Sequence, residues 1–107
     1  MENPILRVHK AIRERLRFGL LFDRGGLRTF DMLGYSRNDL KTHLERQFLR
    51  GMSWDNYGEW HVDHIVPLST FSRNDIDEIR ACWALPNLRP IWAKDNLRKH
   101  ANIHYLI

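Results

Sequence analysis

The order of secondary structure in the second half of the chain constrains the fold most. Residues 60–68 are rich in β-branched side chains and favour an extended strand, which a proline stops near its end. Residues 87–91 form a second short strand candidate, and residues 93–100 predict a closing helix. Between the strands, Asn74 is a candidate N-cap for a short helix over residues 76–83. The sequence thus predicts a strand, an inserted segment, a second strand and a helix.

Two longer helical patterns precede this part. From Pro4 to Phe22, apolar residues recur at helical spacing while basic residues fall mostly on the other side, so we expect an amphipathic helix. Glycines then break the pattern, and the next predicted helix starts after Ser36, a candidate N-cap with Asp39 three positions on. Gly51 is expected to close that helix as its C′ glycine. Both helices would cover a modest core.

Composition narrows the class of protein. With 43% hydrophobic residues and one cysteine, the chain is expected to fold without a disulfide, in a reducing compartment, for which the cytoplasm is the default. No apolar run approaches the ~20 residues that span a bilayer, so neither a signal peptide nor a membrane helix is expected. The net charge of +4 favours a polyanionic partner, and the first 30 residues carry seven Arg or Lys against three acids. A charge excess of this size agrees with nucleic-acid binding but is also common in proteins that bind no nucleic acid.

One adjacent pair has chemistry suited to phosphodiester hydrolysis. Asp63 offers a hard oxygen ligand for Mg²⁺ or Mn²⁺, and His64 belongs to the residue type that accepts a proton near neutral pH. Neighbouring residues on a strand point to opposite faces, so the two can flank a substrate only if the strand bends or the phosphate bridges them. By itself an Asp-His pair is far more often structural than catalytic.

The spacing of two further segments changes that weighting. The run Asn87-Leu88-Arg89-Pro90-Ile91 begins 23 residues after His64, and the segment over residues 92–99, with Asn96 in it, follows directly. Together with residues 63–67, Asp-His-Ile-Val-Pro, these segments resemble the HNH (ββα-metal) nucleases. The likeness is closest to small phage and prophage HNH endonucleases, and the pair with a helical asparagine also resembles the HNH domain of RNA-guided CRISPR nucleases. The resemblance covers about residues 34–100.

The resemblance implies an α+β fold in which a ββα-metal hairpin and helix over residues 57–100 join an N-terminal helical part over residues 1–50. The whole chain, residues 1–107, would be a single HNH endonuclease domain that hydrolyses DNA with one divalent cation, Mg²⁺ or Mn²⁺. The implied roles fall on the motif residues: His64 as general base, Asp63 and Asn96 as metal ligands, and Asn87 as a scaffold residue that orients the loop beside the catalytic histidine.

Further residues have two open interpretations each. His100 lies one helical turn after Asn96 and resembles a second helical metal ligand, or is a surface residue. His61 lies on the same strand face as Asp63 and either binds a metal-bound water or phosphate, or packs. Four basic side chains near the motif either contact the DNA backbone or form a solvated face, namely Arg89, Lys94, Arg98 and Lys99.

One departure from the resemblance concerns zinc. Many HNH proteins hold a structural zinc with two Cys-x-x-Cys pairs, but this chain has a single cysteine, so no structural zinc is expected. Packing of Trp92, Trp83 and Trp54 is expected in its place.

Two rival functions stay open: a non-catalytic DNA-binding or phage packaging-accessory module, and a subunit active only beside a phage terminase or another protein partner. The sequence does not fix the oligomeric state, the target or the number of strands cut.

Overall fold

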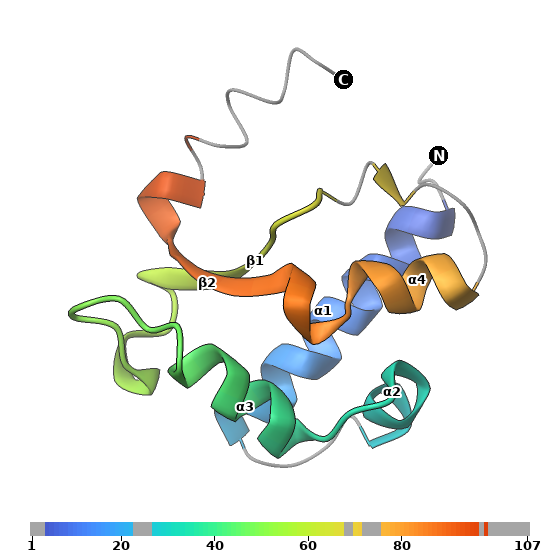
Figure 1. Cartoon of the computed structure of the whole chain (residues 1–107), viewed down its shortest axis with the longest axis horizontal. Coiled ribbons are helices and arrows are strands. Elements are labelled where there is room, and N and C mark those ends of the chain that lie inside the picture. The colour runs from blue at the N-terminus through green and yellow to red at the C-terminus, as the bar shows by residue number, and fades with distance from the viewer. Residues whose placement is uncertain (1–3, 23–26, 68–69, 72–75, 97, 99–107) are drawn as a thin grey trace.

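A single hairpin carries the β structure in the part of the chain that the structure describes. The computed structural model describes residues 4–22, 27–67, 70–71, 76–96 and 98. Strands β1 (Trp60–His64) and β2 (Leu88–Trp92) pair antiparallel, with His64 opposite Leu88 and Trp60 opposite Trp92. Residues 93–96 and 98 are helical, so a helix follows β2 directly. The fold is therefore α+β, with several helices around a two-stranded hairpin (Figure 1).

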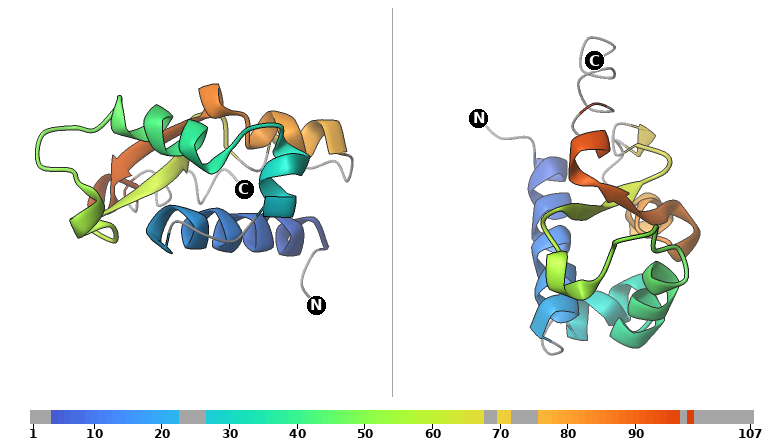
Figure 2. Two further views of the ribbon diagram at one scale, coloured as in Figure 1. Left: turned by 90° about the horizontal axis from the view of Figure 1, so that it is seen from below. Right: turned by 90° about the vertical axis from the view of Figure 1, so that its left-hand side faces the viewer.

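Helix α1 (Pro4–Phe22) matches the predicted bounds. Its side chains at Ile12, Leu16 and Leu20 are buried, as the helical spacing predicts. Basic residues on its remaining surface are exposed. Figure 2 (left) shows α1 along one side of the molecule, with α3 and α4 on the opposite side. This helix therefore supplies one wall of the core.

Helix α2 (Leu27–Leu33) was not predicted. It ends at Gly34, whose φ of +87° places it in the left-handed region. The Tyr35 N–H donates to the Phe30 carbonyl and the Gly34 N–H donates to the Asp31 carbonyl, which together make a Schellman motif. The helix is too short to produce a recognisable apolar periodicity, and its glycine stop signal was the feature that could have revealed it.

Helix α3 (Arg37–Glu45) begins as predicted and ends earlier than predicted. The Asp39 N–H donates to Ser36 Oγ and the Ser36 N–H donates to Asp39 Oδ2, so the capping box is confirmed. The prediction that Gly51 is the C′ residue is wrong, because the helix ends at Glu45 and tighter turns follow. Gly51 instead has a φ of +95° in a later turn, where the Trp92 ring would lie 3.5 Å from an added Cβ.

The remaining elements fill the space around the hairpin. Strand β1 ends at His64, earlier than the predicted residue 68. Helix α4 (Ile76–Cys82) lies within the predicted range of residues 76–83. Asn74, the predicted N-cap of this helix, lies outside the described residues. The core includes Trp83, and Trp54 packs against it. Within the described ranges, no helix is long and apolar enough to cross a bilayer.

Candidate active site

Asp63 and His64 are the last two residues of β1, and both are buried. Asp63 is 5% exposed and His64 is 7% exposed. Strand alternation places His61 and Asp63 on one face of the hairpin and His64 on the other. The predicted ligand and the predicted base therefore leave the strand in different directions at its end, where pairing stops.

The carboxylate of Asp63 is paired with a cation across the hairpin. Arg89 lies directly opposite Asp63 in the strand register, and its Nε donates to Asp63 Oδ2 at 3.0 Å. A buried carboxylate is costly unless it is paired, so this contact explains how Asp63 is tolerated in the strand. Arg89 is itself 41% exposed, which leaves its guanidinium in contact with solvent. The sequence predicts either a DNA contact or a solvated position for Arg89, and the pairing with Asp63 is neither.

Asn87 holds the chain that leaves β1. Its Nδ2 donates to the carbonyls of Cys82 and Val66, at 2.8 and 3.2 Å, and its Oδ1 accepts from the Val66 N–H at 2.7 Å. Its own carbonyl accepts from the Ile65 N–H at 2.8 Å. Asn87 is the last residue of a short 3₁₀ turn (Leu85–Asn87) just before β2. It thus connects the start of β2, the end of α4 and the two residues that follow His64.

Asn96 lies in the helical residues after β2, and its side-chain oxygen is buried. Within the described part of the chain, Asn96 Oδ1 has no hydrogen-bond partner. Buried side-chain oxygens are normally bonded, so each exception calls for a reason, such as an ion that binds there.

His64 packs against a tryptophan from the insert. The ring centroids of His64 and Trp83 are 4.3 Å apart, and the rings meet nearly at right angles, at 84°. Trp83 follows α4 directly and is 2% exposed. Sequence reasoning assigned Trp83 to packing alone, because no sequence pattern links it to a residue in β1.

His61 lies beside an aromatic cluster. Its ring centroid is 6.1 Å from that of Tyr57, which also packs edge to face on Trp60. The guanidinium of Arg17 lies 5.9 Å from the Tyr57 ring centroid, so α1 brings a cation close to this end of the hairpin. Burial raises the pKa of Tyr57, and the nearby guanidinium groups of Arg17 and Arg13 partly oppose that shift.

The other predicted contacts with DNA and metal are located only in part. Lys94 and Arg98 are exposed on the final helix, and Arg98 is 3.9 Å from the Asp95 carboxylate. Lys99 and His100 lie outside the described residues. The predicted DNA contact of Lys99 and the predicted metal ligation by His100 therefore stay predictions.

The side-chain oxygens of Asp63 and Asn96 are hard donors, of the type that Mg²⁺ prefers over softer metals. Nowhere in the described ranges do three or more His, Cys, Asp or Glu side chains gather as a metal site. Mg²⁺, however, is usually held by one or two protein oxygens, with water and phosphate completing its shell. The carboxylate of Asp63 and the unbonded oxygen of Asn96 are donors of that kind.

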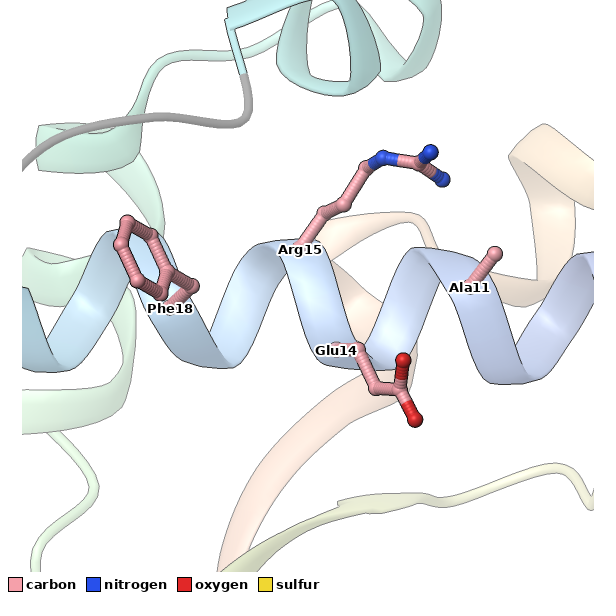
Figure 3. Close-up of a pocket in the computed structure, with 4 residues that line it drawn as sticks. All are labelled: Ala11, Glu14, Arg15 and Phe18. Atoms are coloured by element: carbon pink, nitrogen blue, oxygen red, sulfur yellow. The ribbon is translucent and has the colours of Figure 1, made fainter.

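A surface hollow on α1 is separate from these residues. Figure 3 shows four side chains of that helix around it, Ala11, Glu14, Arg15 and Phe18. None of the predicted site residues lines it.

Two viral proteins are similar to this chain. Uncharacterized protein L426 of Acanthamoeba polyphaga mimivirus is 32% identical over 98 residues, which are 91% of this chain and 43% of that protein. Uncharacterized protein L246 of the same virus is 32% identical over 96 residues, 89% of this chain and 42% of that protein. The chain thus spans less than half the length of these relatives. No family model and no solved structure matches it.

Proposed function

We propose that this chain is a metal-dependent DNA endonuclease of the HNH (ββα-metal) class. The observation that carries the proposal is the order of elements around the motif residues: Asp63 and His64 end β1, β2 pairs antiparallel with β1, and a helix with Asn96 follows β2 directly. This order is the one that the HNH resemblance implies. Asn87 adds support, since it bonds to the backbone that follows His64, as a scaffold residue would.

Asp63 and Asn96 would hold a single Mg²⁺ or Mn²⁺. When bound, the cation supplies Lewis-acid stabilisation of the charge that develops on the scissile phosphate and the leaving oxygen. Asp63 is already beside Arg89, so the guanidinium and the cation would share one carboxylate. The exposed part of Arg89 would in addition face a phosphate, which is one of the two roles that the sequence leaves open for it.

His64 would act as the general base. Its imidazole takes a proton from a water molecule, the water oxygen forms the new bond to phosphorus, and the bond to the 3′ oxygen breaks, which leaves a 5′ phosphate. A general base contacts only the attacking water and does not itself contact the DNA backbone. The small exposed fraction of His64 is therefore compatible with this role. Trp83 restricts the directions in which the ring can point.

Lys94 and Arg98 are the described helix residues proposed to contact the DNA backbone, with Arg89 beside Asp63. Contacts of this kind release counterions, so DNA affinity should fall steeply as the salt concentration rises.

A non-catalytic DNA-binding or packaging-accessory module is the second candidate. One observation favours it: the Asp63 carboxylate is already engaged by Arg89, as a purely structural aspartate would be. Such a protein would bind DNA with strong salt dependence and would leave it intact with any metal.

Incubation with supercoiled plasmid distinguishes the endonuclease from the non-catalytic DNA-binding module. We expect the purified chain to nick the plasmid with Mg²⁺ or Mn²⁺, EDTA to stop the reaction, and His64→Ala to lose it while remaining folded, with a lowered Tm because a buried ring is removed. Cleavage that persists in EDTA, or full activity of His64→Ala, would overturn the mechanism. Binding without cleavage in every metal, also in the presence of candidate protein partners, would establish the second candidate.

A further inference from the structure

A buried histidine on α1 is connected to His64 through one tryptophan. The indole N–H of Trp83 donates to His9 Nδ1 at 2.9 Å, between residues 74 positions apart in the sequence. The same indole ring packs nearly perpendicular on His64, with centroids 4.3 Å apart. His9 and Trp83 are each 2% exposed. Three parts of the chain, α1, the end of α4 and the end of β1, thus meet at one indole ring.

The direction of the hydrogen bond fixes the state of His9. An indole N–H can only donate, so His9 Nδ1 must accept and the imidazole proton lies on Nε2. Burial lowers the pKa of His9, the positive charge of Arg13 lowers it further, and the polar backbone of Phe71 opposes both. His9 is therefore neutral at neutral pH and available as an acceptor.

This bond acts on the indole itself. The backbone of Trp83 is held separately, because the Tyr35 hydroxyl donates to its carbonyl at 2.7 Å and its N–H donates to the Ile79 carbonyl. Those two bonds hold the backbone and do not involve the indole. The bond to His9 holds the indole N–H while the indole ring packs on His64 nearly at a right angle.

We propose that His9 and Trp83 are positioning residues that hold the His64 imidazole in one orientation. Their effect on DNA cleavage rests on the proposed function, whereas their effect on the orientation of His64 does not. A general base must point its acceptor nitrogen at the attacking water, and small misplacements reduce the rate strongly. In this proposal α1 belongs to the catalytic architecture, although it lies outside the hairpin and the helix that carry the motif.

The test replaces the acceptor and reads His64 directly. His9→Leu removes the acceptor at similar volume, and His9→Asn keeps one in the form of an amide oxygen. The ring-proton NMR signals of His64, assigned by their loss in His64→Ala, report its place in the ring current of Trp83. We expect His9→Leu to shift these signals and to lower kcat for plasmid nicking about 10- to 100-fold with KM unchanged. His9→Asn should restore both.

Tyr35→Phe is the matched control, since it removes a hydrogen bond to the Trp83 backbone without touching the indole. It should lower the Tm and leave the His64 signals and kcat unchanged. Trp83→Phe is a second variant, which removes the indole N–H and leaves His9 in place; it should lower kcat even if His9→Leu does not fold. In the Trp83→Phe background, His9→Leu should lower kcat no further, because the N–H that His9 accepts is gone.

The proposal is overturned if His9→Leu folds and leaves the His64 signals in place, or if Tyr35→Phe moves them as far as His9→Leu does. It is also overturned if His9→Leu lowers kcat by the same factor with and without the indole N–H. Failure of the proposed function gives different results. In that case the wild type does not cut DNA, or His64→Ala cuts it as well as the wild type does. The His64 NMR signals would still respond to His9→Leu in either case.

Discussion

The two asparagines of the motif have opposite environments. The side chain of Asn87 is fully engaged, with two bonds from its Nδ2 and one to its Oδ1. The side-chain oxygen of Asn96 is also buried, but has no partner among the residues that the structure describes. Unbonded buried oxygens are costly, so each calls for a reason, such as a bound ion. In the proposed function Asn87 holds the fold and Asn96 offers its oxygen to a metal. Substitutions of the two asparagines test this difference and Arg89→Leu tests the other proposed metal ligand, in order of their effect on the free energy of unfolding.

Asn87→Ala should have the largest effect on stability. It leaves the Cys82 carbonyl and both polar groups of Val66 without their side-chain partner. We expect the free energy of unfolding to fall by about 3 kcal/mol, a decrease in Tm of roughly 10–20 °C for a domain of this size. Thermal unfolding followed by circular dichroism measures it. A loss below about 1 kcal/mol would contradict the scaffold assignment.

The thiol of Cys82 gives a local readout of the same change. Cys82 is fully buried, and burial raises its pKa to about 12, so it should resist thiol reagents in the native protein. Asn87 bonds to the carbonyl of this residue, so Asn87→Ala should open the region and speed labelling. The two proteins are compared at urea concentrations that give them equal free energies of unfolding. Equal labelling rates under those conditions would show that Asn87 does not hold this end of the hairpin.

Arg89→Leu should have an intermediate effect. It leaves the buried Asp63 carboxylate without its cation, but the exposure of Arg89 weakens the pair, so we expect a loss of about 1–2 kcal/mol. If Asp63 is also a metal ligand, Mg²⁺ should raise the Tm of Arg89→Leu more than that of the wild type, because the ion replaces the missing charge. The Asp63→Asn, Arg89→Leu double variant is the control and should not respond to Mg²⁺. An equal response of all three proteins would contradict metal binding by Asp63.

The parts of the fold that depend on local interactions along the chain could be predicted from the sequence. The hairpin, the final helix, α1 and the capping box of α3 follow from local signals: β-branched runs, apolar spacing, and Ser36 with Asp39. Helix α2 was missed because it is too short for a periodic pattern, and Gly51 was misassigned because a glycine near a helix end need not be its C′ residue.

The candidate site divides in the same way. Asp63, His64, Asn87 and Asn96 could be selected from their spacing and the HNH resemblance. The contacts around them could not, because they join distant segments. The Arg89 pair depends on strand register, and the bond between Trp83 and His9 depends on how α1 packs against the end of α4. The sequence therefore predicts the residues proposed to do the chemistry and the scaffold residue Asn87, but not the contacts of Arg89, Trp83 and His9.

Asn96→Leu should have the smallest effect on stability and the clearest effect on function. Leucine has a similar volume and removes a buried oxygen that has no described partner, so the Tm should stay the same or rise. Loss of a metal-ligating oxygen should nevertheless lower plasmid nicking about 100-fold or more at limiting Mg²⁺, an effect at least as large as that of removing a supporting residue around a metal. Asn96→Asp is the matched variant: it keeps the oxygen, adds charge, and should retain nicking at lower Mg²⁺. A fall in Tm for Asn96→Leu comparable to that of Asn87→Ala would show that the two asparagines are both structural. Normal nicking by a stable Asn96→Leu would remove Asn96 from the metal site and leave Asp63 as its only described protein ligand.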